Sequence, residues 1–227
     1  MDKYEKIARV YPSIAGFVIP IILTTLFINR FFPSGWDQWE IIVAKVALFI
    51  PIPVFYGAIG FCLRTTIANT SKLIFQIPIF KQDETQMPTT LLLSWNSSKR
   101  KSQQDIRNIA KKVKEDFGIK LFSEKEAEKN PEEEKRIIVD AVGKIRELTR
   151  GNANLQQYNR LYGFCRNYLG ACVYAIGFII IAFIANYTFS LELNTYLWCA
   201  LIIQVIFGVI SFLALKPIGY EYAKALF

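Results

Sequence analysis

Two uncharged apolar runs decide the fold: LGACVYAIGFIIIAF at residues 169–183 and YLWCALIIQVIFGVISFLAL at residues 196–215. The second run has the length of about 20 residues that a helix needs to cross roughly 30 Å of hydrocarbon. The first run reaches a similar length with the residues that follow it, and a short polar bend at residues 190–195 separates the two. The pattern predicts a helical hairpin in lipid over residues 168–227, with its first span at about 168–187 and its second at 196–215.

Two earlier apolar stretches predict a second hairpin over residues 1–64, with spans at about 11–29 and 41–63. Charged residues precede the first stretch, as they would in a signal peptide. The stretch is long, however, and no small-residue cleavage site follows it, so we expect a retained span.

The second of these spans contains Pro51 and Pro53. Proline removes a backbone hydrogen bond and kinks or breaks a helix. Two interpretations stay open at this point: a kink that serves packing only, and a hinge in a gated pore.

Residues 65–167 differ from the apolar hairpins on either side. Their 19 basic and 13 acidic residues give a net charge of +6, out of +8 for the chain. Amphipathic helices are predicted at 102–117, between Ser102 and Gly118, and at 131–150. Their apolar faces need a partner, which is the other helix, a stalk or a second subunit. We therefore predict an all-α membrane protein: four transmembrane helices with a helical cytoplasmic insert, residues 65–167, between helices 2 and 3.

The placement of lysine and arginine predicts one orientation. Basic residues precede the first span and follow the fourth, and 19 lie between the second and third spans. The loops at 31–43 and 187–195 contain none. The flanking basic residues are Lys3, Lys6, Arg9, Lys216 and Lys224. By the positive-inside rule, we expect a multi-pass protein of the bacterial inner membrane with both termini, the insert and a short C-terminal tail in the cytoplasm.

The sequence offers no catalytic set. The chain has no histidine, which removes the commonest general base and the commonest metal ligand. No glycine-rich phosphate loop occurs. The acidic run at residues 132–134 is interpreted as a solvated helix start. The four cysteines (Cys62, Cys165, Cys172 and Cys199) lie in or beside apolar runs without a CxxC pair, which favours packing roles. We expect no enzyme, cofactor or metal.

A face of small and polar residues on the fourth span is a candidate pore lining. Ala200, Gln204, Gly208 and Ser211 recur at helical spacing on this face. A polar group in hydrocarbon is costly, so it should face protein or water. Two interpretations stay open for Gln204, an interhelical hydrogen bond and a pore lining. No span carries a central acid or base, which disfavours a proton-coupled transporter. Because four spans are few for a conduit, a pore would need a homo-oligomer such as a tetramer.

Basic and aromatic residues of the insert form a candidate ligand site. One interpretation is positive charge that contacts anionic lipid headgroups. The other is a docking site for a nucleotide or short oligonucleotide, with Trp95, Tyr158 and Tyr162 as stacking residues. Arg146 lies in the same basic region, at the end of the second predicted helix. The candidate ligand-binding residues are Lys99, Arg100, Lys101, Arg107, Lys111, Lys112, Arg150, Tyr158 and Arg160.

The layout of two spans, a cytoplasmic insert and two more spans resembles the SMODS-associated four-transmembrane effectors of bacterial anti-phage nucleotide-signalling systems (CBASS-like or Hailong-like). The supporting stretches are Met87-Pro88-Thr89-Thr90, Phe117-Gly118-Ile119 and Tyr162-Gly163-Phe164-Cys165-Arg166-Asn167. The resemblance implies that a nucleotide signal from a partner nucleotidyltransferase opens a membrane pore and stops the growth of infected cells. The alternative is a non-conducting membrane scaffold whose basic insert recruits a protein partner or anionic lipid.

Overall fold

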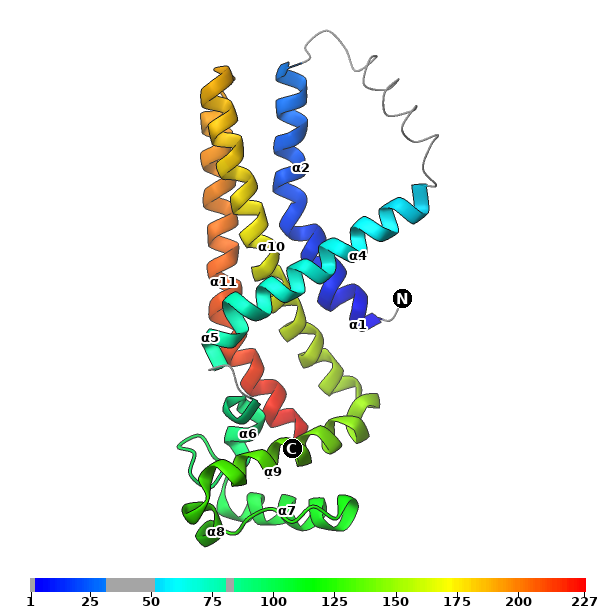
Figure 1. Ribbon diagram of the computed structural model, residues 1–227, viewed down its shortest axis with the longest axis vertical. Coiled ribbons are helices and arrows are strands. Elements are labelled where there is room, and N and C mark those ends of the chain that lie inside the picture. Colours follow the sequence, from blue (N-terminus) through cyan, green and yellow to red (C-terminus); the bar gives the residue numbers. More distant parts are fainter. Residues whose placement is uncertain (1–2, 32–51, 81–83) are drawn as a thin grey trace. The chain divides into compact units, whose positions relative to one another are not determined.

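The computed structural model describes residues 3–31, 52–80 and 84–227, and within these ranges every regular element is a helix (Figure 1). The chain divides into two units. The first, which we call the apolar unit, consists of Met1–Lys72 and Phe164–Phe212; the second, the polar unit, consists of Leu73–Gly163 and Leu213–Phe227. Two long helices, α10 (Ala153–Phe189) and α11 (Asn194–Leu226), contribute to both units.

The apolar unit holds most of the membrane-compatible sequence. Among the described residues, three stretches are long and apolar enough to cross a membrane: Lys6–Phe27, Ala153–Phe189 and Asn194–Leu226. They cover most of the first predicted span and all of the third and fourth. The prediction of an all-α membrane protein is confirmed to that extent. Besides α10 and α11, the helices of this unit are α1 (Lys3–Glu5), the π-helical turn η1 (Lys6–Val10), α2 (Tyr11–Phe31) and α4 (Ile52–Ser71).

The second predicted span, 41–63, lies partly outside the described residues. Its later half belongs to α4, and residues 41–51 are not described. The four-span layout therefore stays a prediction.

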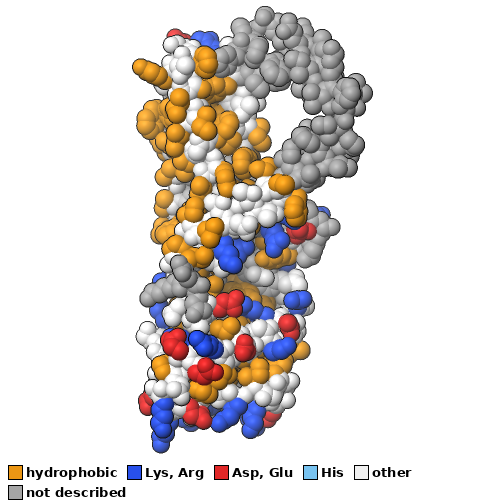
Figure 2. Space-filling model, in the orientation of Figure 1, with side chains coloured by type: hydrophobic (Ala, Val, Ile, Leu, Met, Phe, Trp, Pro, Cys, Tyr) orange, Lys and Arg blue, Asp and Glu red, His pale blue; other side chains and the backbone are white. Residues whose placement is uncertain are grey.

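The outer surface of the apolar unit is hydrophobic. Ile181 is 65% exposed, Ile184 62% and Ile210 55%. Hydrophobic side chains cover the helices of this unit in Figure 2. A contiguous apolar surface of this kind is unfavourable in water and suits lipid. Its interior joins α2, α10 and α11 through Leu23, Ile179 and Leu197.

The bend between α10 and α11 is held by one amide side chain. Asn186 Oδ1 accepts a hydrogen bond from the backbone N–H of Leu193 at 2.9 Å, and Asn186 Nδ2 donates to Asn194 Oδ1 at 2.9 Å. Ser190 and Glu192 adopt positive φ values of 49° and 59° within the bend. The helical hairpin predicted for the last two apolar runs is present. The hydrophobic periodicity did not indicate that a buried Asn186 amide would stabilise its bend.

The polar unit is built from short helices around the two amphipathic ones. Ser102 caps α7 by accepting a hydrogen bond from the backbone N–H of Asp105, and Gly118 ends the helix with φ 69°. Both local signals in the sequence predicted these ends correctly. The helices of this unit are η2 (Lys72–Gln76), α5 (Ile77–Phe80), η3 (Glu84–Gln86), α6 (Pro88–Leu93), α7 (Gln103–Phe117), α8 (Glu124–Lys129), α9 (Pro131–Leu148) and η4 (Thr149–Gly151).

The faces of α7 and α9 pack together within the chain. Val113 of α7 and Ile138 of α9 share a core with Leu93 of α6 and Leu155 of α10. Leu226 joins the same core, because α11 continues past Lys216 as a helix. The residues predicted as a C-terminal tail therefore form the last turns of α11.

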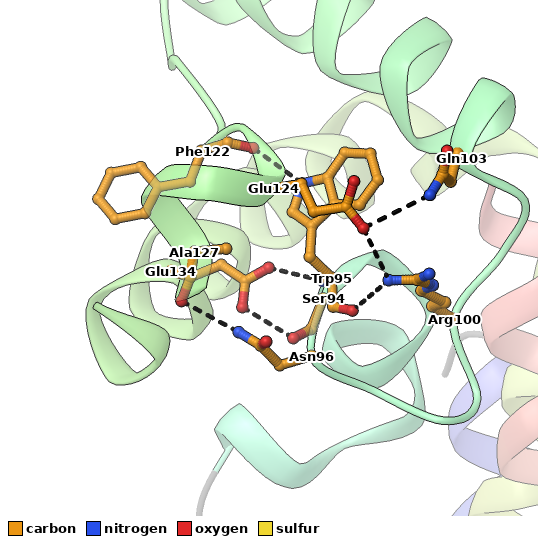
Figure 3. A network of polar contacts seen from close by, with 9 residues as sticks. All are labelled: Ser94, Trp95, Asn96, Arg100, Gln103, Phe122, Glu124, Ala127 and Glu134. Atoms are coloured by element: carbon orange, nitrogen blue, oxygen red, sulfur yellow. Dashed lines mark hydrogen bonds and ion pairs between the residues drawn. The ribbon is translucent and has the colours of Figure 1, made fainter. Parts of the chain in front are cut away.

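The interpretation of residues 132–134 as a solvated helix start is wrong for Glu134. Its side chain is buried, with 1% exposure. Glu134 Oε2 accepts a hydrogen bond from Ser94 Oγ at 2.8 Å, and Oε1 accepts one from the backbone N–H of Trp95 at 2.7 Å (Figure 3). The Trp95 indole donates to the carbonyl of Phe122 at 2.9 Å. Trp95 is only 7% exposed, so it is a core residue and not a stacking surface for a base.

Glu126 stabilises the start of α8 through a capping box. Its carboxylate accepts hydrogen bonds from the backbone N–H and hydroxyl of Ser123, both at 2.8 Å, and Lys120 Nζ lies 3.1 Å away. The backbone N–H of Ser123 contributes most, followed by its hydroxyl and Lys120. Together these contacts lower the pKa of Glu126 from 4.5 to about 2.

A pH titration tests this contact. Because the pKa is lowered in the folded state, the stabilisation is present above about pH 4.5 and is lost as the pH falls toward 2. Ser123→Ala removes the hydroxyl and keeps the backbone N–H, so we expect it to raise the pKa of Glu126 only part of the way to 4.5. The measurement is a titration of the Glu126 side-chain carboxyl resonance by NMR in detergent micelles. A pKa near 4.5 in the parent protein would contradict the capping box.

Candidate functional site

The candidate pore face of α11 packs against α10 within the chain. Ala200, Gln204 and Ser211 are buried, and Gly208 is half-buried. Gln204 Nε2 donates a hydrogen bond to Cys172 Sγ at 3.1 Å. A Cβ added at Gly208 would lie 3.7 Å from the same sulfur. The structure thus shows the interhelical hydrogen bond that was one interpretation of Gln204, and the pore-lining role stays a prediction.

Among the described residues, one acceptor atom of Gln204 has no hydrogen-bond partner. This atom, Oε1, is buried. A buried polar group without a partner costs about 1–3 kcal/mol. The amide therefore satisfies only part of its hydrogen-bonding capacity in this packing of α10 and α11. The sequence indicated Gln204 by its polarity in an apolar run, but nothing in it indicated Cys172 as the partner.

The predicted hinge falls largely outside the described residues. Pro51 lies in the part of the chain that the structure does not describe, and Pro53 lies near the start of α4. The hinge stays a prediction.

Three of the candidate ligand-binding residues near α7 contact aromatic or backbone groups of the polar unit, although Lys99 and Arg100 are exposed. Lys99 Nζ lies 5.3 Å from the Tyr220 ring centroid, and Lys101 Nζ lies 6.0 Å from that of Phe227. Arg100 Nη1 donates to the carbonyl of Trp95 at 2.6 Å (Figure 3). These three cations therefore stabilise the fold of the loop that precedes α7. The other three (Arg107, Lys111 and Lys112) are exposed on α7.

The remaining candidates form a separate group at the start of α10. Gln156 joins two of them: its Nε2 donates to the carbonyl of Arg150 at 2.7 Å, and its Oε1 accepts from Arg160 Nη1 at 3.4 Å. Tyr158 is half-buried on the same helix. Gln156 thus connects Arg150 and Arg160 near the start of α10, away in sequence from the candidates near α7.

A cavity in the polar unit contains none of the nine predicted ligand residues. Its volume is about 330 Å³. Helices α5, α6, α9, α10 and α11 all contribute to its wall, which includes Arg146, Glu84 and Gly143. The other lining residues are Gln76, Phe80, Met87, Pro88, Thr89, Thr90, Val139, Val142, Asn159, Tyr162, Gly219 and Tyr222. Sequence reasoning missed the cavity because its lining comes from segments far apart in the chain. The sequence did place Arg146 in a basic region, but it gave no reason to distinguish Arg146 from the cations around it.

Among the described residues, Arg146 is the cation of this wall, and it is exposed. Its Nη2 donates to Thr89 Oγ1 at 3.3 Å, and its guanidinium carbon lies 5.9 Å from the Tyr222 ring centroid. An arginine between a hydroxyl and an aromatic face can bind an anionic oxygen with its remaining N–H groups.

The described residues define an all-α protein with three candidate membrane-spanning helices and a polar unit that contains an open cavity. Comparison of the chain with protein-family models, with curated proteins and with solved structures finds no match. The resemblance to four-span defence effectors is therefore carried by the sequence layout, and it enters below as a proposal.

Proposed function

We propose that the protein is a pore-forming membrane effector of bacterial anti-phage defence, gated by a cytoplasmic nucleotide or oligonucleotide. One observation carries the proposal: α10 and α11 each run without interruption from the polar unit, with its cations and cavity, into the apolar unit. A ligand that binds one arrangement of the polar unit more tightly would shift these helices and so favour one state of the pore.

The conducting state would be an assembly of several copies. A chain with three or four spans encloses too little space for a conduit by itself, so we propose a homo-oligomer, such as a tetramer, in the bacterial inner membrane. The charge distribution supports cytoplasmic termini and a cytoplasmic polar unit. A partner nucleotidyltransferase would supply the signal, and anionic lipids would contact the basic surface.

Ligand-dependent leakage tests this function. Liposomes that contain the protein and a trapped dye should release the dye when the activating nucleotide or oligonucleotide is added. If the exposed lysines of α7 bind the signal, Lys111→Glu with Lys112→Glu should weaken the response by about tenfold or more, because two phosphate contacts become repulsive.

A matched control makes the same charge change elsewhere. Lys125→Glu with Lys129→Glu on α8 alters the net charge of the polar unit equally but lies outside the predicted ligand set. This variant should respond as the parent does. The gating proposal fails if no nucleotide or oligonucleotide causes release. An unchanged response of the α7 variant would assign Lys111 and Lys112 to lipid contact.

A non-conducting scaffold is the second candidate, and the packing of the polar face of α11 on α10 favours it. In a scaffold, the basic unit would recruit a protein partner or anionic lipid. Gln204→Leu with Ser211→Leu separates the two functions. A scaffold should keep its recruitment after these substitutions, whereas a water-lined pore should lose or change its conductance.

A further inference from the structure

We infer that the cavity of the polar unit is a binding site for a single mononucleotide-class ligand, with one phosphate group and one planar base. The inference deepens the proposed function and depends on it in one respect, that this ligand is the gating signal. The ligand would then bind at the wall formed by α6, α9, α10 and α11, and not at the exposed lysines of α7.

The size of the cavity limits the ligand. Its volume of about 330 Å³ lies at the lower end of the range of small-molecule pockets, roughly 300–1,000 Å³. A single nucleotide is a molecule of that size class, whereas an oligonucleotide needs an open groove along several residues. The cavity therefore favours a monomer.

The charge of the wall selects the number of phosphates. Among the described residues that line the cavity, Arg146 is cationic and Glu84 is anionic, so the formal charge of this described lining is zero. The contacts that the structure shows for Arg146 are to Thr89 and Tyr222, and neither neutralises its charge. The planar guanidinium fork can bind one phosphate through two parallel hydrogen bonds. Even one phosphate exceeds the single positive charge of Arg146, and the described lining residues include no further cation for a second or third phosphate, so a monophosphate is less unfavourable than a triphosphate.

Aromatic and amide side chains supply the base subsite. Phe80 and Tyr162 line the cavity with ring centroids 6.5 Å apart and an interplanar angle of 50°, and Tyr222 lies under the guanidinium of Arg146. Stacking of a base on an aromatic ring contributes about 1–3 kcal/mol in nucleic-acid sites. Asn159 also lines the wall, where its amide can pair with the edge of a base. Because Tyr222 lies at Arg146, an aromatic face is next to the guanidinium group that would bind the phosphate.

A larger side chain at Gly143 would fill the cavity and would leave the contacts of Arg146 in place. Gly143 lies inside α9 and lines the cavity, and a Cβ added there would meet nothing within 4 Å. Alanine at this position should be tolerated, because glycine inside a helix is about 0.5–1 kcal/mol less favourable than alanine. A phenylalanine should occupy the opening.

The test is binding to the full-length protein in detergent, measured by equilibrium dialysis. The probes are AMP, CMP, GMP and UMP, with ATP, inorganic phosphate and a short oligonucleotide for comparison. We expect at least one monophosphate to bind more tightly than all three comparison probes. Arg146→Gln and Gly143→Phe should each weaken that binding by about tenfold or more, whereas Gly143→Ala should leave it unchanged.

Arg136→Gln is the matched control for charge. It removes one exposed cation of α9 that lies outside both the cavity lining and the predicted ligand set, so binding should stay as in the parent. Arg146→Lys should give a value between the parent and Arg146→Gln, because lysine keeps the charge and loses the fork. Unfolding temperatures that match the parent would show that each variant is folded; where Gly143→Phe unfolds early, Arg146→Lys and Arg146→Gln decide.

The inference is overturned if no monophosphate binds, if inorganic phosphate binds as tightly as the nucleotides, or if the Arg136 variant loses binding and the Arg146 variant keeps it. Dye release separates this inference from the proposed function. Monophosphate binding without release removes the gating function and keeps the site. If an oligonucleotide still causes dye release in both the Arg146→Gln and the Gly143→Phe variant, the proposed function stands and the cavity is not the ligand site.

Discussion

Glu134→Ala is expected to lower the free energy of unfolding of the polar unit by about 3–5 kcal/mol. The substitution leaves two buried donors without an acceptor, the hydroxyl of Ser94 and the backbone N–H of Trp95. Each unmet donor costs about 1–3 kcal/mol, and the lost carboxylate contacts are charge-assisted. Glu134→Gln should have a smaller effect, because its amide keeps one acceptor oxygen. Thermal unfolding, together with hydrogen exchange at the Trp95 amide, measures the loss.

The neighbouring acid is the control for this prediction. Glu133 is exposed and lies one residue earlier in the same first turn of α9. Glu133→Ala should change the stability by no more than about 0.5 kcal/mol, as is usual for a surface position. Equal effects at the two positions would show that helix-terminal charge, and not the buried contact, stabilises this part of the unit.

Gly170→Ala is expected to destabilise the apolar unit by about 1–3 kcal/mol. A Cβ at this position of α10 would collide with the carbonyl of Ile67 and would lie 2.9 Å from the Cβ of Ser71, both on α4. The Ser71 hydroxyl donates to the carbonyl of Arg166 nearby, so the two helices are also tied together there. Because the obstacle is backbone, α4 and α10 would have to move apart. The midpoint of thermal unfolding in detergent should fall.

Gly177→Ala tests the same chemistry on the same helix without the close contact. A Cβ at Gly177 would meet nothing within 4 Å. Alanine there should be neutral or should stabilise by about 0.5–1 kcal/mol, because it favours the helix. A fall in the unfolding midpoint equal to that of Gly170→Ala would rule out close packing of α4 on α10 as the cause.

The ends of several helices could be predicted because the signals are local. The Ser102 side chain satisfies a free N–H within its own first turn, and Gly118 adopts a left-handed conformation that other residues avoid. Pro131 starts α9 for a similar reason. These choices depend on neighbours a few residues away, so they can be inferred from a short window.

The candidate site could not be predicted in the same way. Arg146 and Lys111 are both cations in a basic region, and only the packing of α6, α10 and α11 beside α9 places Arg146 in a cavity wall. Glu134 is buried because it accepts hydrogen bonds from Ser94 and Trp95. These two residues lie in the loop after α6, about 40 residues earlier in the chain. Composition and periodicity contain no information on such pairings.

Hydrophobicity and its period were sufficient to assign an all-helical membrane protein, since lipid requires long uncharged segments whose backbone hydrogen bonds close within each helix. Tertiary structure alone decided which polar groups are enclosed, which glycine admits a neighbouring backbone and where a cavity remains. These outcomes arise from contacts between residues far apart in sequence, whose energies depend on distance and burial as well as on residue type.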